Sequence, residues 1–137
     1  MSVQDAMQLS HKHCDELFAA AEQAVVSKDW DSANSAWQQF TDELESHITD
    51  KEEGKLFPAL EAIHGSIGPI HVMRGEHDHM RSLVAQINEA LAAKDDQQFL
   101  GLSETLMMLM QQHNMKEEHI LYPMIDGSVP DAMALIS

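Results

Sequence analysis

The amino-acid sequence predicts an all-α protein, an up-down-up-down antiparallel four-helix bundle that forms a single domain over residues 1–137. Three observations support this fold class. Apolar residues recur at intervals of three and four along most of the chain, which is the period of a helix buried on one face. Alternating apolar runs between turn dipeptides, which are typical of strands, are nearly absent. The connections between the helical stretches are short, and short connections favour antiparallel neighbours.

Two helices are predicted in the first half of the chain. The apolar face of the first continues to about Ser27, after which residues 28–32 break the pattern and offer Asp31 or Ser32 as the N-cap of the second helix. Pro58 is expected to kink or end this second helix, because proline cannot donate the backbone hydrogen bond. The two apolar faces consist of Met7, His11, Cys14, Phe18, Ala21 and Val25, and of Ala33, Trp37, Phe40, Leu44 and His47.

Two more helices are predicted in the second half. The stretch HGSIGP, residues 64–69, is the only cluster of glycine and proline in mid-chain and is predicted to be a loop. A third helix follows Pro69, and Asp95 or Asp96 begins the fourth. Their apolar faces consist of Met73, His77, Met80, Val84, Ile87 and Leu91, and of Phe99, Leu102, Leu106, Leu109 or Met110, His113, Glu117, Ile120, and Tyr122 or Met124.

The net charge excludes several classes of function. Twenty-three acidic residues against 8 basic ones give a formal charge of −15, so the surface would repel nucleic acids and acidic membranes. No apolar run approaches the ~18 to 20 residues that span a bilayer. The N-terminal stretch is polar and the chain has a single cysteine, which excludes an internal disulfide. A cytoplasmic location is therefore expected.

The two halves of the chain resemble one another. His11 and His77 are 66 residues apart, and so are His47 and His113. The stretch HITDKEEGKLFP, residues 47–58, resembles HNMKEEHILYP, residues 113–123. Each has a histidine, a Lys-Glu-Glu triplet and an ending of apolar, aromatic and proline residues. The repeat predicts a bundle with two-fold pseudosymmetry.

The four repeated histidines are expected to meet inside the bundle. All four fall on apolar faces, and within each helix pair they lie equally far from the connecting turn, ~24 to 26 Å at ~1.5 Å per residue. A single histidine on such a face is usually a hydrogen-bonded core residue. Four at one level, with two glutamates nearby, would be a costly polar core whose cost a bound cation removes. The sequence therefore predicts a metal site.

Two glutamates are candidates for the carboxylate ligands. Glu117 follows His113 by four residues, so both project from one helix face. Four residues after His47 stands Lys51, which cannot bind a cation. Alignment on the prolines makes Glu52 the counterpart of Glu117, with a spacing of five that a π-bulge would accommodate.

Other residues near these positions are weighed as alternatives. Glu53 is the alternative to Glu52, and Gly54 could help the chain absorb the irregular spacing. His13 ranks second to His11, because it lies two residues off the apolar face. Surface positions are expected for His64, His71, His79 and His119, and core packing for Cys14 and the methionines of residues 106–110. Glu118 is expected to face away from the site. Tyr122 is expected either to pack in the core or to support the site.

Six nitrogen and oxygen ligands suit two metal ions bridged by the glutamates, although a single ion is the alternative. Bundle cores with paired carboxylates commonly hold two iron or two manganese ions. Histidine-rich ligation without thiolate favours iron, with manganese and zinc as alternatives. The predicted ligands are His11, His47, Glu52, His77, His113 and Glu117.

At these residues the sequence resembles the hemerythrin-like, HHE cation-binding domain family. The resemblance is carried by SHKHCDELF, HITDKEEGKLFP, VMRGEHDHMR and QQHNMKEEHILYP, and it covers almost the whole chain. It implies a four-helix bundle with an oxo- or hydroxo-bridged non-haem di-iron centre, held by the same six residues.

The resemblance also bears on function. Oxygen-carrying members of the family have a further histidine one turn after the ligand in the third helix, where this chain has Arg81. The ligand set is thus more similar to the iron–sulfur repair branch, and it is expected to leave a coordination position open. The expected function is a cytoplasmic di-iron protein that binds O2, NO or peroxide for sensing, storage or scavenging, with a redox partner that the sequence does not identify. The alternatives are a redox enzyme that turns over peroxide or NO, and an iron store or iron–sulfur repair donor.

Overall fold

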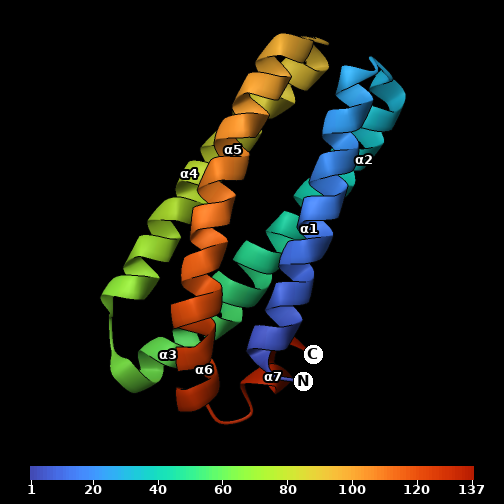
Figure 1. Cartoon of the computed structure of the whole chain (residues 1–137). Helices are drawn as coiled ribbons and strands as arrows, with labels where there is room; N and C mark the ends of the chain where they lie inside the picture. The colour runs from blue at the N-terminus through green and yellow to red at the C-terminus, as the bar shows by residue number, and fades with distance from the viewer.

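The computed structural model describes all residues 1–137 and consists of helices and connecting turns, without strands (Figure 1). The predicted all-α class is therefore confirmed. The elements in chain order are α1 (Val3–Val26), α2 (Trp30–Glu45), the π-helix η1 (Ser46–Leu56), α3 (Phe57–His64), α4 (Gly68–Ala92), α5 (Asp96–Lys116), the π-helix η2 (Glu117–Leu121), α6 (Tyr122–Ser128) and α7 (Ala132–Ile136). Because η1 and η2 follow their neighbours without a break, the chain forms four long helical segments, residues 3–26, 30–64, 68–92 and 96–128, and one short helix.

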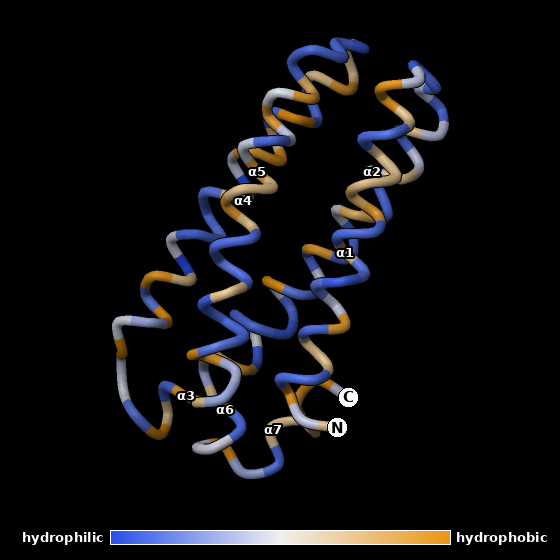
Figure 2. Tube along the Cα trace, in the orientation of Figure 1, coloured by the Kyte–Doolittle hydropathy of each residue, from blue (hydrophilic) through white to orange (hydrophobic).

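The long segments pack as two pairs. α1 lies along α2 and α4 lies along α5, with further contacts between α1 and α5 and between α2 and α4 (Figure 1). Figure 2 shows hydrophobic positions that recur along each long helix between hydrophilic ones, as expected for helices with one buried face. Both chain ends lie beside α7, at the same end of the bundle as α3 and α6 (Figure 1). None of the helices combines the length and apolarity needed to cross a bilayer.

The apolar interior is divided into two parts. One, here the turn-end core, is formed mainly by α1, α2, α4 and α5 near the two tight turns. The other, the terminal core, is formed near the chain ends and includes residues of α3, α6 and α7. Along α1, His11 lies between Met7 of the terminal core and Cys14 of the turn-end core, and His77 has the same place on α4. A polar layer therefore separates the two cores.

The helix starts agree only partly with the sequence analysis. The prediction of Asp31 or Ser32 as the N-cap is wrong, because α2 begins at Trp30 and the carboxylate of Asp29 accepts from the Ser32 backbone N–H at 3.2 Å. Asp95 is confirmed as the N-cap of α5. The residues before these caps, Lys28 and Lys94, both have a left-handed backbone with φ of 57° and 53°. The internal repeat of the sequence thus includes the two tight turns, which share the same backbone conformation and the same capping residue.

Of the two outcomes expected at Pro58, a kink or an end of the second helix, the end is wrong. Pro58 is the second residue of α3, where a missing N–H is tolerated, and the helical segment continues to His64. It ends at Gly65, whose φ of 74° is in the region that favours glycine. The predicted loop over residues 64–69 is correspondingly shorter, because α4 already begins at Gly68.

The irregular helix predicted between His47 and Glu52 is confirmed. The π-helix η1 spans both residues, and the Glu52 side chain is fully buried. At the end of η1 the Phe57 N–H donates to the carbonyl of Glu52, five residues earlier. Pro58 follows at once and has no N–H with which to restore the α-helical bond at the next position.

The second π-helix, η2, is not predicted by the sequence, because the spacing of four between His113 and Glu117 is regular. At its end the Tyr122 N–H donates to the Glu117 carbonyl, five residues earlier. This extra residue moves the buried face by one position. Ile120, predicted on the apolar face, is 53% exposed, and Leu121 is buried instead.

Gly54 lies inside η1 and gives a test of the π-helical backbone. A Cβ atom at this position would lie 3.0 Å from the Thr49 carbonyl oxygen, whereas a Cβ at Gly101 on α5 would meet nothing within 4 Å. We expect Gly54→Ala to lower the free energy of unfolding by about 1 kcal/mol or more, because a backbone carbonyl must shift. The matched variant Gly101→Ala should raise it by up to about 1 kcal/mol, as alanine does in an open helix position. Urea unfolding of the metal-free variants measures both, and equal stabilisation by the two would contradict the close approach.

Candidate metal centre

The six predicted ligand side chains lie together in the polar layer between the two cores. They come from four different segments, and each is at most 6% exposed. His11 lies on α1, His47 and Glu52 on η1, His77 on α4, His113 on α5 and Glu117 on η2. The alternative ligand His13 does not join them, because its side chain is 55% exposed. The histidines expected at the surface, namely His64, His71, His79 and His119, are exposed.

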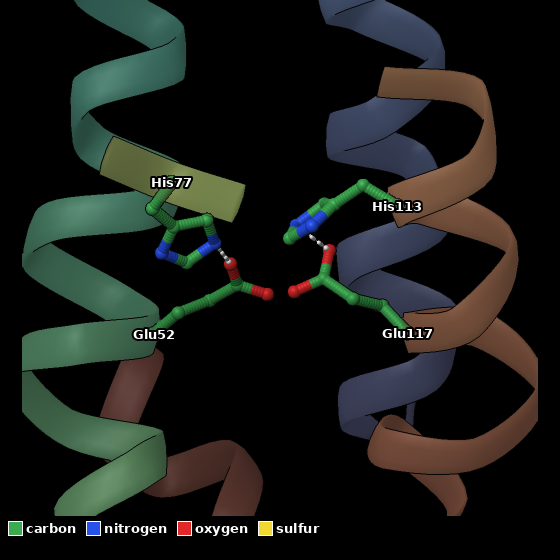
Figure 3. A group of neighbouring side chains, drawn as sticks. All are labelled: Glu52, His77, His113 and Glu117. Atoms are coloured by element: carbon green, nitrogen blue, oxygen red, sulfur yellow. Dashed lines mark ion pairs between the residues drawn. The ribbon is translucent and has the colours of Figure 1, made fainter. Parts of the chain in front are cut away.

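The ligand atoms form two overlapping groups. The first, here the four-residue group, consists of Glu52, His77, His113 and Glu117, and the second, the three-residue group, consists of His11, His47 and Glu117. Within each group the ligand atoms lie within 4.8 Å of one another. Figure 3 shows the two carboxylates of the four-residue group facing each other, each beside its histidine. Because Glu117 belongs to both groups, its carboxylate lies where it could bridge two ions.

Distances within the centre show that Glu52 also reaches both groups. Its carboxylate lies 3.0 Å from Nε2 of His77 (Figure 3) and 3.5 Å from Nε2 of His47. On the other side, Oε1 of Glu117 lies 3.1 Å from Nε2 of His113. Two carboxylates from equivalent segments therefore stand between two pairs of histidines, as the sequence repeat predicts.

Each of the four histidines is held by a hydrogen-bond partner outside the centre. A carboxylate partner fixes the Nδ1–H tautomer and directs the lone pair of Nε2 inward, which is the orientation that a metal ligand needs. Ser10 in turn donates to Glu43 at 3.3 Å, so its hydroxyl oxygen is free to accept. The four Nδ1 partners are Glu118 for His11 (2.8 Å), Ser10 for His47 (2.8 Å), Glu53 for His77 (2.7 Å) and Glu76 for His113 (2.9 Å).

Several inward-facing atoms have no hydrogen-bond partner. They are Oε1 of Glu52, Nε2 of His77, Nε2 of His113 and Oε2 of Glu117, all of them buried. The Glu52 and His77 atoms lie 3.0 Å apart, within ion-pair distance, yet neither atom has a hydrogen-bond partner. Unpaired buried polar atoms are costly. A cation between them would remove that cost, so the residues fit a metal centre.

Charge inside the centre also favours a cation. Burial opposes the ionisation of Glu117, but His113 and the hydrogen bonds around the carboxylate hold its pKa well below the usual value. Burial likewise opposes the charging of His47, but Glu52 and Glu117 raise the pKa of His47 to about 10. Nε2 of His47 lies 3.1 Å from Nε2 of His11. A proton on Nε2 of His47 therefore separates two nitrogen lone pairs that would otherwise face each other in the metal-free centre. A metal ion must displace that proton.

Two of the outer carboxylates are kept ionised by cationic side chains. Burial raises the pKa of Glu53, but hydrogen bonds from Arg81 and His77 bring it below the usual value, and the Arg81 contact is 2.8 Å. Burial likewise raises the pKa of Glu76, but hydrogen bonds from Lys116, at 2.6 Å, and from His113 bring it below the usual value. Arg81, which stands one turn after His77, thus supports the carboxylate partner of His77.

Sequence reasoning misplaced Glu118 and did not identify Ser10 and Glu76 as partners of the histidines. Glu118 does not face away but accepts from His11, and Glu53 is an outer partner rather than a member of either ligand group. The signal was present in the repeat, because the first glutamate of each Lys-Glu-Glu triplet faces inward and the second binds a histidine from outside.

The hydroxyl of Tyr122 lies 2.7 Å from Glu52 and 2.9 Å from Glu117, at the middle of the centre. Burial, together with these two carboxylates, raises the pKa of Tyr122 well above its usual value, so it is a neutral donor here.

Comparison with known protein families gives a match over most of the chain. The family model described as the hemerythrin HHE cation-binding domain matches residues 2–125 of the 137. Neither the curated proteins nor the solved structures contain a significant match to this chain.

The assignment of Glu52 against Glu53 is testable. Glu52→Gln should remove at least one bound metal ion per chain, because it removes a carboxylate from the inner group. Glu53→Gln should keep the number of ions but weaken binding by about 10- to 100-fold, the usual effect of losing an outer partner of a ligating histidine. Metal content after dialysis against a buffered metal solution measures both, with the exposed Glu16→Gln as the control. If Glu53→Gln lost an ion while Glu52→Gln kept all of them, the assignment would be reversed.

Metal affinity should rise with pH. The pKa of His47 is about 10 in the metal-free centre, so between pH 6 and 8 metal binding must release at least one proton. The dissociation constant for zinc should therefore fall by about tenfold or more for each pH unit in this range. Competition with a chelator whose own protonation is known measures the slope. His47→Gln should bind more weakly and with a slope lower by about one proton, and an affinity independent of pH in the wild type would contradict the protonated centre.

Proposed function

The chain belongs to the hemerythrin HHE cation-binding domain family, and from this premise we propose that it is a non-haem di-iron protein that binds O2 or a related small ligand, NO or peroxide, for sensing, storage or scavenging. Family membership and the clustered histidines and glutamates support cation binding. The proposal adds the identity of the metal, the number of ions and the ligand.

The observation that carries the proposal is the pair of overlapping ligand groups that share Glu117. Two groups with a common carboxylate support two ions rather than one. The ligand atoms are nitrogen and oxygen, which favours iron over softer metals, with manganese and zinc as alternatives. Cys14 supplies no thiolate, because burial, and after it the charge of Glu43, raises the thiol pKa to about 12. Bound iron would supply an open coordination position and the electrons for reduction of a small ligand.

A small cavity beside the centre supports a ligand of diatomic size. Its volume is about 10 Å³, close to the least that holds one water molecule. Its walls include three of the candidate ligands, His11, His47 and His113, and the apolar side chains Leu44, Ile48, Met80 and Met110. An organic substrate would not fit, whereas O2, NO or peroxide would need only a small adjustment of these walls.

The contacts of the helices support three further parts of the proposal. The pairwise packing of four long segments supports the up-down-up-down bundle. The terminal core joins Val3 to Ala132, near opposite ends of the chain, which supports one domain over residues 1–137. The single cysteine is in keeping with a reducing, cytoplasmic location.

A second candidate function is iron storage or donation, and a polar surface groove favours it. The groove has a volume of about 390 Å³ and lies between α1 and α5. Asp15, Glu118 and His119 line it, and the candidate ligand His11 is part of its wall. A cation could therefore reach the centre without crossing either apolar core.

Metal analysis and optical spectroscopy test the proposal together. Protein purified without a histidine tag should contain two iron ions per chain. Loading with ferrous iron without oxygen, followed by exposure to air, should produce near-ultraviolet absorption bands that disappear on reduction. His113→Gln should lose iron and the bands, whereas the exposed His71→Gln should keep both.

Other outcomes of the same measurements would redirect the assignment. Absence of metal and of any spectral change would contradict the proposal. Consumption of peroxide or NO beyond the iron present would indicate a redox enzyme. Loss of the iron to a chelator within minutes would favour iron storage or donation.

A further inference from the structure

Tyr122 occupies a place in the centre that neither its packing nor its sequence position explains. It is the only tyrosine of the chain and it is fully buried at the start of α6. Its hydroxyl oxygen lies within 3.2 Å of atoms from four of the six candidate ligands. These are Oε2 of Glu52 (2.7 Å), Oε1 of Glu117 (2.9 Å), Nε2 of His47 (3.1 Å) and Nε2 of His11 (3.2 Å).

The hydroxyl cannot satisfy these neighbours as a hydrogen-bond donor. It has one proton, which the two carboxylates compete to accept. Nε2 of His11 is a third acceptor, because its ring donates from Nδ1 to Glu118. Even with a proton on Nε2 of His47, two donors face three acceptors, which leaves an excess of lone pairs around a single point. A metal ion in contact with the hydroxyl oxygen relieves that excess, whereas a neutral side chain does not.

The distances suit an ion shared by the three-residue group and the hydroxyl. Four atoms arranged tetrahedrally about one ion at ~2.1 Å are roughly 3.4 Å apart. The six distances among the hydroxyl oxygen, Nε2 of His11, Nε2 of His47 and Oε1 of Glu117 are between 2.9 and 3.9 Å. The hydroxyl thus gives the three-residue group the fourth ligand atom that the other group already has.

We propose that the hydroxyl oxygen of Tyr122 is a seventh ligand of the metal centre and binds the ion held by His11, His47 and Glu117. This inference rests on the proposed metal function and adds a residue to it. On binding, the O–H bond breaks, an oxygen–metal bond forms and the proton passes to solvent, with no change of oxidation state. Tyrosine is a known ligand type for ferric iron in proteins.

The internal repeat shows that the hydroxyl is not needed for packing. Phe57 has the equivalent position before the proline in the first half of the chain. Its ring stacks on His77 with centroids 5.8 Å apart and an angle of 10° between the planes. The ring of Tyr122 lies at the same 5.8 Å from His11. The aromatic ring therefore serves both halves, and only the hydroxyl is specific to the second.

The test compares the ferric wild type with Tyr122→Phe, the residue that the first half uses. The wild type should show a visible charge-transfer band whose resonance Raman spectrum contains tyrosinate vibrations. Because the chain has one tyrosine, such vibrations can come only from Tyr122. Tyr122→Phe should lose the band and bind the ion of the three-residue group about tenfold or more weakly. The double variant Tyr122→Phe, Met108→Tyr restores a tyrosine at a 59% exposed position and should still lack the band.

Iron content, measured on the same samples, separates the two proposals. Two ions per chain without tyrosinate vibrations in the wild type would overturn the inference about Tyr122 and leave the di-iron function standing. The inference about Tyr122 would also be overturned, and the di-iron function left standing, if Tyr122→Phe kept the band and the wild-type affinity for each of the two ions. A wild type that binds no metal would overturn both proposals.

Discussion

The structure depends on one electrostatic constraint, the burial of two carboxylates among four histidines. Glu52 and Glu117 are fully buried, and no lysine or arginine reaches them. The cationic side chains stop one layer further out, at Glu53 and Glu76. The protein thus places its fixed positive charges where they support the histidines and leaves the inner negative charge to a proton or a metal ion. Such a layer opposes folding unless it is occupied, because removing charge from water is costly. The two apolar cores on either side supply the stability that keeps it closed.

The same constraint accounts for the irregular backbone. Each carboxylate has to lie at the level of the histidines while the segment behind it continues into the terminal core. A regular α-helix after Glu52 would set the following residues one position out of phase with that core. The π-helices insert the extra residue, which brings Leu56 and Leu121 inward. Both irregularities occur directly beside the inner carboxylates and nowhere else in the chain, in keeping with the tendency of π-bulges to mark functional sites.

The sequence predicted what depends on periodicity and missed what depends on contacts between segments. The four histidines followed from spacing along apolar faces, and Glu52 followed from the position of a proline. The π-helix η2 was not predicted, because His113 and Glu117 have the four-residue spacing of a regular α-helix and the irregularity begins only after them. The burial of Leu121 in place of Ile120 is what reveals it. The role of Glu118 as a partner of His11 depends on the distance between α1 and η2, which no local pattern encodes. The central place of the Tyr122 hydroxyl likewise results from residues more than 60 positions away meeting at one point.

The repeat suggests two equivalent halves, yet the charges around the two ligand groups differ. On the side of the four-residue group, Arg81 and Lys116 balance the carboxylates that hold His77 and His113. On the other side, Glu118 has no such cation, and His47 is held by a serine rather than a carboxylate. An imidazole backed by a carboxylate is the more basic ligand. Two ions bound here would therefore lie in unlike fields even though their ligands come from duplicated sequence. The inner histidines and glutamates are the same in both halves, whereas the two halves differ in Ser10 against Glu76 as a histidine partner and in the Tyr122 hydroxyl, which Phe57 lacks.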